Sequence, residues 1–364
     1  MKNIFSLLFF ISSTNCIAQF PWVQIPGSEI RKITSTIVAG QEYELQILLP
    51  GGYKNSNKKY PVVYLMDSQW DFPLVKSIYG QQYFDGFIPE LIVVGITWGG
   101  TNPNPDSLRA RDYTPTNDGR QKQSGGADKF FSFMRTELFP FIENNYKTDN
   151  KNRTIMGCSL GGLITMYALF AQPDMFTGYA AASPAIGWDK EVIYQYEKKY
   201  FESHSSLPAR LYMTIGGVER NVPGFERLAK FLRERNYSSL HILPKVLENT
   251  GHSGTKSETF SRGLQYVFER PQVKLNDDLL NKYTGTYEIS GNKAEIKKEN
   301  GNLVLNFPDG DKYFLYAGGE NYFYSINEFL NIHFKISAEK AVGFQLDRYG
   351  GTQYFSQNNR DELK

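Results

Sequence analysis

The chain has 364 residues, of which 41% are hydrophobic, so it is long enough for two domains and can bury a sizeable core. Its 40 basic and 38 acidic side chains leave a net charge of +2, and this balance gives no indication of a nucleic-acid or membrane-surface partner. The 24 tyrosines and 26 phenylalanines predict clefts rich in aromatic rings.

The first 20 residues have the format of a secretory signal: a lysine, a short apolar run over 4–11, and a small-residue cleavage site ending at Ala18. The run is too short to span a bilayer permanently. We therefore expect cleavage of residues 1–18 and a secreted or periplasmic protein, in preference to a buried N-terminal helix or a lipoprotein anchored at Cys16. Cys158 is then the one cysteine of the mature chain, which excludes an internal disulfide and cysteine-based zinc sites.

Strands and helices are expected to alternate as far as residue 268. Apolar runs of β-forming residues predict buried strands, and apolar residues at helical spacing predict helices between them. The predicted strands are 34–49 (interrupted by a turn at Gly40), 60–66, 91–98, 153–157, 179–183, 210–216 and 240–247. The predicted helices are 127–144, 160–172, 223–235 and 256–268. This alternation predicts an α/β fold with a mostly parallel sheet and helices on both faces.

The pattern changes after Pro271, where short alternating strands are separated by turn signals such as Glu299-Asn300-Gly301 and Pro308-Asp309-Gly310. No long helix is expected beyond Leu280. We therefore predict a catalytic domain over 19–271 and a small antiparallel all-β domain, a sandwich or barrel, over 272–364. We also expect this second domain to lie beside or over the cleft and to extend the binding surface for large substrates. The alternative is a domain with its own core that only aids stability or solubility.

The strongest chemical signal is the G-x-S-x-G pattern from Gly157 to Gly161, which follows a predicted strand and opens an apolar helix. In this context the pattern predicts a nucleophile elbow, in preference to an ordinary tight turn. Ser159 is then the nucleophile, and the backbone N–H of Leu160 is one donor of the oxyanion hole.

A serine hydroxyl needs a base to take its proton, and the chain has four histidines. His252 is the predicted base, because it lies in a glycine-rich loop between the last strand and last helix of the first domain, where the histidine of a Ser–acid–His order falls. His204 lies in a polar stretch, His241 inside an apolar strand, and His333 in the C-terminal β region.

The acid of the triad must be a glutamate if it comes from residues 190–276, because that segment has no aspartate. Glu219 is the predicted acid, since it follows the strand 210–216 at the carboxyl edge of the sheet. Its role is to orient the imidazole and to stabilise its positive form. Glu248, which is close to His252 in sequence, remains an alternative.

Three further segments are candidates for the cleft. A backbone N–H of Ser68 or Gln69, after the strand 60–66, is predicted as the second oxyanion donor, with an ordinary strand end as the alternative. The long polar loop 99–126 carries Arg109 and Arg111, which are candidates for substrate binding. Trp188, after another strand end, is a candidate ring for the substrate pocket or for plain packing.

These motifs resemble the esterase D-like group of α/β-hydrolases, which includes siderophore esterases, feruloyl esterases and S-formylglutathione hydrolases. The resemblance covers about residues 35–270 and depends on these segments: LPGGY at 49–53, YPVVYLMD at 60–67, RARDYTP at 109–115, GCSLGG at 157–162, SPAIGW at 183–188 and GH at 251–252. The MD pair at 66–67 and RARDYTP are more similar to the siderophore-esterase branch. Glu219 departs from the many relatives that use aspartate there.

The resemblance implies an α/β-hydrolase fold, a Ser–Asp/Glu–His triad, and no metal or cofactor. It implies a small-molecule ester as the partner, with siderophore lactones ahead of feruloyl-type esters. We therefore predict an exported serine esterase. The alternatives are an acyltransferase on the same fold and a binding protein that keeps the hydrolase scaffold without turnover. The sequence gives no indication of oligomeric state.

Overall fold

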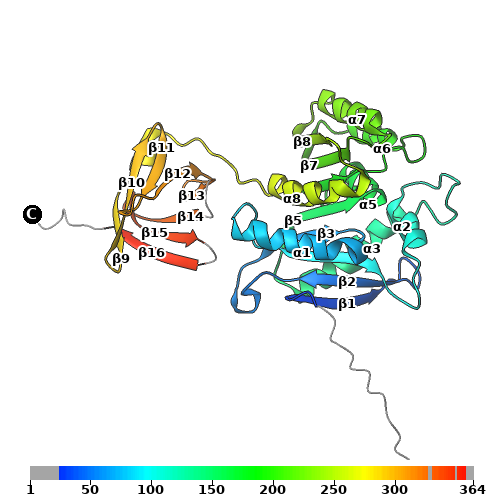
Figure 1. The fold of residues 1–364 in the computed structure, drawn as a ribbon, viewed down its shortest axis with the longest axis horizontal. Helices are drawn as coiled ribbons and strands as arrows, with labels where there is room; N and C mark the ends of the chain where they lie inside the picture. The colour runs from blue at the N-terminus through cyan, green and yellow to red at the C-terminus, as the bar shows by residue number, and fades with distance from the viewer. Residues whose placement is uncertain (1–23, 327–329, 349–350, 358–364) are drawn as a thin grey trace, which may run out of the picture.

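The computed structural model describes residues 24–326, 330–348 and 351–357 (Figure 1). The predicted signal peptide and Cys16 lie outside these residues. Among the helices of the described part, none is long and apolar enough to cross a membrane.

The first domain of the fold is built on one sheet of eight strands in the order β1-β2-β4-β3-β5-β6-β7-β8. The pairs β1–β2 and β2–β4 are antiparallel and all other neighbours are parallel. The expected α/β sheet is therefore confirmed. Its strands are β1 (Ser28–Thr34), β2 (Glu42–Leu48), β3 (Tyr60–Leu65), β4 (Ile92–Trp98), β5 (Thr148–Cys158), β6 (Gly178–Ala182), β7 (Ser206–Gly216) and β8 (Ser238–Leu247).

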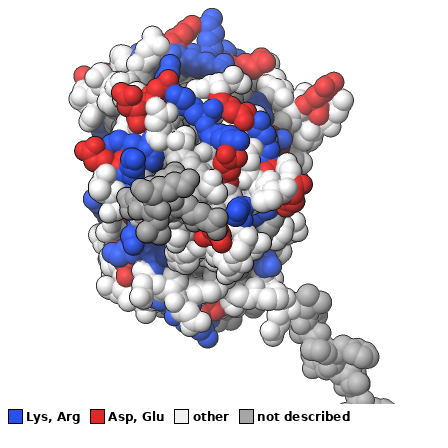
Figure 2. Space-filling model, turned by 90° about the vertical axis from the view of Figure 1, so that its left-hand side faces the viewer, with Lys and Arg blue, Asp and Glu red and all other residues white. Residues whose placement is uncertain are grey.

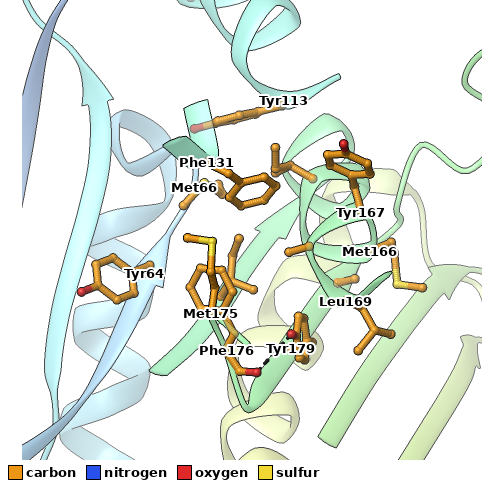
Figure 3. Packing of buried hydrophobic residues seen from close by; sticks show 14 of the residues in the cluster. Tyr64, Met66, Tyr113, Phe131, Met166, Tyr167, Leu169, Met175, Phe176 and Tyr179 are labelled. Atoms are coloured by element: carbon orange, nitrogen blue, oxygen red, sulfur yellow. Dashed lines mark hydrogen bonds between the residues drawn. The ribbon is translucent and has the colours of Figure 1, made fainter. Parts of the chain in front are cut away.

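Helices cover both faces of this sheet. One face packs on α1 (Ser68–Phe84) and α8 (Thr255–Val267), and the other on the remaining helices. These are α2 (Pro105–Tyr113), α3 (Ala127–Phe133), α4 (Phe139–Asn145), α5 (Leu160–Ala171), α6 (Ile193–Phe201) and α7 (Val222–Glu234), with helical turns η1 (Tyr53–Asn55), η2 (Met134–Leu138, π-type) and η3 (His252–Gly254). Figure 3 shows aromatic and methionine side chains of one buried cluster packed together, among them Tyr64, Phe131 and Met175.

The chain before β2 differs from the prediction. β1 covers Ser28–Thr34, ahead of the predicted start at residue 34, whereas residues 36–39, predicted as strand, belong to a turn that ends at the predicted turn residue Gly40. Ser35 and Thr36 both donate hydrogen bonds to the carboxylate of Glu137, about a hundred residues away. This tertiary anchor outweighs the β propensity of the segment.

Three of the helices that cover the sheet, α1, α2 and α6, were not predicted. α1 begins at Ser68, directly after β3, and α2 lies inside the loop 99–126. The side chain of Asn104 caps α2 by accepting a hydrogen bond from the Ser107 N–H at 3.1 Å. α1 and α2 prove to be central to the candidate site.

The second domain of the fold is a closed antiparallel barrel of eight strands. It follows α9 (Asp277–Asn281) and contains β9 (Gly285–Ile289), β10 (Asn292–Glu299), β11 (Asn302–Asn306), β12 (Lys312–Ala317), β13 (Tyr322–Ser325), β14 (Leu330–Ser337), β15 (Lys340–Arg348) and β16 (Gly351–Gln357). Aromatic and aliphatic side chains such as Tyr287, Ile332 and Phe344 form a core of its own. The expected all-β domain is confirmed, and it is the barrel. Figure 2 views the molecule from the barrel side, where acidic and basic side chains are interspersed.

The barrel lies on the side of the eight-stranded sheet where its parallel strands begin (Figure 1). A cleft of about 530 Å³ between the two is lined by Lys58 and residues 86–90, which precede β3 and β4, and by His333 and Asp347 of the barrel. The triad candidates follow the carboxyl ends of the strands. This position contradicts the expectation that the barrel extends the substrate cleft.

We propose the domain boundary at 271/272, and predict that a protein ending at Arg270 folds and cleaves esters. Its kcat/KM should match that of the full chain for p-nitrophenyl acetate and for a large aromatic ester. The reason is that the barrel has a separate core and lies at the opposite end of β5 from the turn that carries Ser159. Steady-state kinetics on both proteins, with circular dichroism to check folding, tests this. A selective loss on the large ester would restore a substrate role for the barrel.

Candidate active site

The register of the sheet brings the candidate residues to one edge. Leu65 of β3 pairs with Met156 of β5, Cys158 pairs with Ala182 of β6, and Ala182 pairs with Thr214 of β7. Parallel neighbours end on the same side, so the segments that follow these strands converge. Those segments begin at residues 66, 159, 183 and 217.

Ser159 lies on a strained turn between β5 and α5. Its φ of 62° and ψ of −116° are unusual for a residue with a side chain. The turn is tight because Gly157 contacts Gly161: a Cβ on Gly157 would lie 2.7 Å from the Gly161 carbonyl. The Ser159 N–H donates to Ala182 O at 3.0 Å, which ties the turn to the next strand. This is the geometry that a nucleophile elbow requires.

Cys158 lies directly before the elbow and is 3% exposed. Burial raises the pKa of its thiol to about 12, so the group stays protonated at pH 8. We predict that iodoacetamide at pH 8 leaves Cys158 unmodified in the folded protein and modifies it after denaturation in urea. Peptide mass spectrometry gives the answer, and rapid labelling of the native protein would mean that the elbow opens.

His252 and Glu219 meet at the same edge. His252 lies in η3 between β8 and α8, and its Nδ1 is 2.6 Å from Glu219 Oε2. The imidazole is 48% exposed and the carboxylate 17%. Burial alone would raise the pKa of Glu219, but hydrogen bonds from Ser183, His252 and Gly216 together lower it below its ordinary value. Glu219 is therefore held as a carboxylate, as an acid that stabilises an imidazolium must be.

Two buried hydroxyls support this pair and were not predicted. Ser183, with a left-handed φ of 37°, donates to Glu219 Oε1 at 2.6 Å and lies 2.9 Å from the hydroxyl of Thr255. Thr255 in turn donates to His252 O at 2.7 Å. The sequence signal that could have indicated Ser183 is its position directly after β6, where the carboxyl ends of the parallel strands meet.

Two helix amino termini face this edge. The N–H groups of Leu160, at the start of α5, and of Ser68 and Gln69, at the start of α1, have no acceptor among the described residues. Such unpaired donors attract negative charge. The side chain of Ser68 packs toward Gly95 on β4, so only its backbone is available to a ligand. No hydrogen bond joins Ser159 to His252 among the described residues; such catalytic contacts often tighten only when substrate binds.

The predicted substrate-binding residues make contacts within the protein. Arg109 forms a bidentate ion pair with Asp67, and Arg111 forms one with Asp112. The indole N–H of Trp188, which is 6% exposed, donates to Thr116 O at 3.1 Å. These contacts favour positioning roles for all three, and their substrate role stays an untested prediction.

Two exposed apolar residues lie next to the site instead. Trp70, on the first turn of α1, is 49% exposed and lies 5.5 Å from the guanidinium of Arg109. Val218, directly before Glu219, is 67% exposed. Exposed apolar groups beside polar catalytic groups are typical of ligand-binding clefts. Trp70 was missed because the sequence gave no indication of a helix beginning at Ser68.

The described residues contain no cluster of three or more His, Cys, Asp and Glu side chains suited to a metal ion. The expectation that no metal or cofactor takes part stays a prediction.

The sequence model of the Esterase family matches residues 35–239 of the chain. The chain belongs to the Esterase family. This membership, together with the relatives below, supports carboxylic-ester hydrolysis as the activity. The family match ends before His252, so the third triad candidate is placed by the geometry described above.

Among relatives of this esterase-family protein is the ferri-bacillibactin esterase BesA of Bacillus subtilis, 33% identical over 54% of this chain and 72% of the relative. A siderophore enterobactin esterase of Emericella nidulans is 34% identical over the same shares. Among solved structures, an IroE-like serine hydrolase from Shewanella oneidensis is 26% identical and superposes with a TM-score of 0.58 over 69% of this chain and 82% of that one. The predicted resemblance and the α/β-hydrolase fold are thereby confirmed.

Proposed function

We propose that the protein is an exported serine esterase that acts through an acyl-enzyme on Ser159. The observation that carries this proposal is the strained elbow at Ser159, which turns a serine out of the sheet beside the unpaired N–H of Leu160. The His252–Glu219 hydrogen bond at the same edge supplies the base and its orienting acid. Substitution of Ser159, His252 and Glu219 one at a time tests the roles of nucleophile, base and acid.

The geometry supports the following sequence of steps. His252 Nε2 takes the proton of Ser159 as its Oγ attacks the ester carbonyl, and Glu219 stabilises the imidazolium that forms. The N–H groups of Leu160 and of Ser68 or Gln69 bind the oxyanion. His252 then protonates the leaving alcohol, and a water activated by the same imidazole releases the acid from Ser159.

We further propose a siderophore-type lactone as the substrate, with feruloyl-type esters as the second candidate. The names of the similar siderophore esterases support this choice. The exposed Trp70 and Val218 also support it, because they offer apolar surface to an aromatic acyl group at the edge of the site.

The test is a substrate panel: a cyclic catecholate trilactone, its linear trimer, a feruloyl sugar, an acetylated sugar and p-nitrophenyl acetate. We expect the highest kcat/KM on the trilactone, with the linear acid identified by mass spectrometry. A clear preference for the acetylated sugar would overturn the substrate proposal and leave the esterase proposal standing. Products esterified to an added alcohol, in preference to free acids, would instead indicate an acyltransferase.

A further inference from the structure

Asp67 directly precedes α1, but its carboxylate binds Arg109 and does not cap the helix. Asp67 is the N-cap of α1, with a left-handed φ of 55°, and its side chain makes no capping hydrogen bond. An aspartate in this position ordinarily accepts a hydrogen bond from the N–H of the second or third residue of its own helix, here Gln69 or Trp70. Here both carboxylate oxygens face Arg109: Oδ1 accepts from Nε at 3.0 Å and Oδ2 from Nη2 at 2.7 Å.

The consequence is that the start of α1 keeps free donors. With the carboxylate turned away, the N–H groups of Ser68 and Gln69 find no acceptor in the described part of the chain. They are the predicted second donors of the oxyanion hole. A carboxylate bound to them would occupy the hole and would repel the negative charge that develops on the ester oxygen.

Arg109 is held so that it can fix this arrangement. It lies on α2, is 15% exposed, and its Nη2 is also 3.4 Å from Cys158 O, on the residue before the nucleophile. Tyr113, one turn further along α2, accepts the Asp67 N–H through its hydroxyl at 3.1 Å. Asp67 Oδ2 would lie 3.1 Å from a Cβ on Gly161, so the carboxylate packs against the elbow itself. The ion pair thus joins the loop before α1 to the strand end that carries Ser159.

We propose that Arg109 is a positioning residue that keeps the Asp67 carboxylate off the amino terminus of α1, so that the N–H groups of Ser68 and Gln69 stay open to the oxyanion. This inference depends on the proposed function, because it assigns a role in the hydrolysis at Ser159. Without the guanidinium, the carboxylate is free to turn back and cap its own helix.

The test compares Arg109→Gln with the double variant Asp67→Gly/Arg109→Gln, which removes the competing side-chain acceptor altogether. Arg109→Gln should lower kcat for p-nitrophenyl acetate by about 10²–10³-fold, the loss typical of one oxyanion donor, with little change in KM. The Ki of an arylboronic acid, whose tetrahedral adduct mimics the oxyanion, should rise by a similar factor. The double variant should recover at least about tenfold in kcat relative to Arg109→Gln, because glycine has no side chain that can accept from these N–H groups and it tolerates the left-handed φ of 55° at this position.

Arg235→Gln is the matched control for stability. Arg235 also pairs with a buried carboxylate, that of Glu197, but it lies at the end of α7. It should lower Tm without a change in kcat or in boronate Ki. If Arg109→Gln behaves like Arg235→Gln, or if the double variant recovers nothing, the ion pair is structural only and the inference is wrong.

Arg109→Lys and Ser159→Ala separate a failure of this inference from a folding defect and from a failure of the proposed function. If Arg109→Gln does not fold, Arg109→Lys replaces it: a lysine keeps the charge without the bidentate geometry, so kcat should fall and Ki should rise together. A kcat equal to wild type in Arg109→Lys, with the boronate Ki unchanged, would contradict the inference. If Ser159→Ala stays active, the proposed function fails. If Ser159→Ala is inactive while Arg109→Gln keeps its kcat, only the role of Arg109 fails.

Discussion

Replacing Ser159 with alanine is expected to lower kcat/KM for every ester by about 10⁴-fold or more, the usual cost of losing a triad nucleophile. Without the hydroxyl no acyl-enzyme forms, whereas the fold has little reason to change, because the strained turn is held by backbone contacts to Gly161 and Ala182. A fluorophosphonate probe should label wild-type protein at Ser159 and should leave the variant unlabelled. Kinetics and peptide mass spectrometry measure the two effects.

Ser132→Ala is the control for this experiment. Ser132 is an exposed serine of α3 whose hydroxyl bonds to its own helix, at Asp128 O. This variant should keep both activity and labelling. Residual turnover in Ser159→Ala close to the wild-type rate, or labelling at another residue, would show that the nucleophile has been misassigned.

The elbow was predictable because its determinants are local. The pattern from Gly157 to Gly161 needs only a strand before it and an apolar helix after it, and both are visible in the hydropathy of residues 153–172. The His252 loop followed from chain order in the same way. Glu219 was predictable because it follows a strand at the same edge of the sheet. The hydrogen bond between His252 and Glu219 agrees with both predictions.

The role of Arg109 was not predictable because its partner is distant in sequence. Asp67 and Arg109 are 42 residues apart, and they meet only once β3 and β5 are neighbours and α2 packs across their ends. A single sequence shows an arginine in a polar loop, for which substrate binding is a reasonable hypothesis. The same holds for the turn at residues 36–40, whose anchor Glu137 belongs to another segment.

The position of the barrel relative to the first domain was also not predictable from the sequence. Its strands followed from short alternating runs and turn signals, since hairpin pairing is local. Where a second domain docks depends on the direction in which α8 leaves the first. α8 begins beside His252 at the catalytic edge and ends at Val267, which lines the cleft at the opposite edge. The barrel, which follows α8 in the chain, therefore lies at the end of the sheet opposite Ser159.

His252→Ala is expected to be nearly as damaging as Ser159→Ala, again by about 10⁴-fold in kcat, because an unassisted serine hydroxyl is a poor nucleophile. The imidazole is about half exposed, so its removal opens a space that solvent can reach. Added imidazole should therefore restore part of the activity in His252→Ala and none in Ser159→Ala. Absence of rescue together with a normal rate in the variant would exclude His252 as the base.

Glu219→Gln should lower kcat by less than His252→Ala, because the base remains while its orientation and its charge partner are weakened. The amide cannot match the present bonding pattern, in which the carboxylate only accepts hydrogen bonds, from Ser183, Gly216 and His252. Glu248→Gln is the matched control, since Glu248 is exposed and close to His252 in sequence. It should leave kcat unchanged. The reverse outcome, an inactive Glu248→Gln beside an active Glu219→Gln, would transfer the role of triad acid to Glu248, the alternative that the sequence left open.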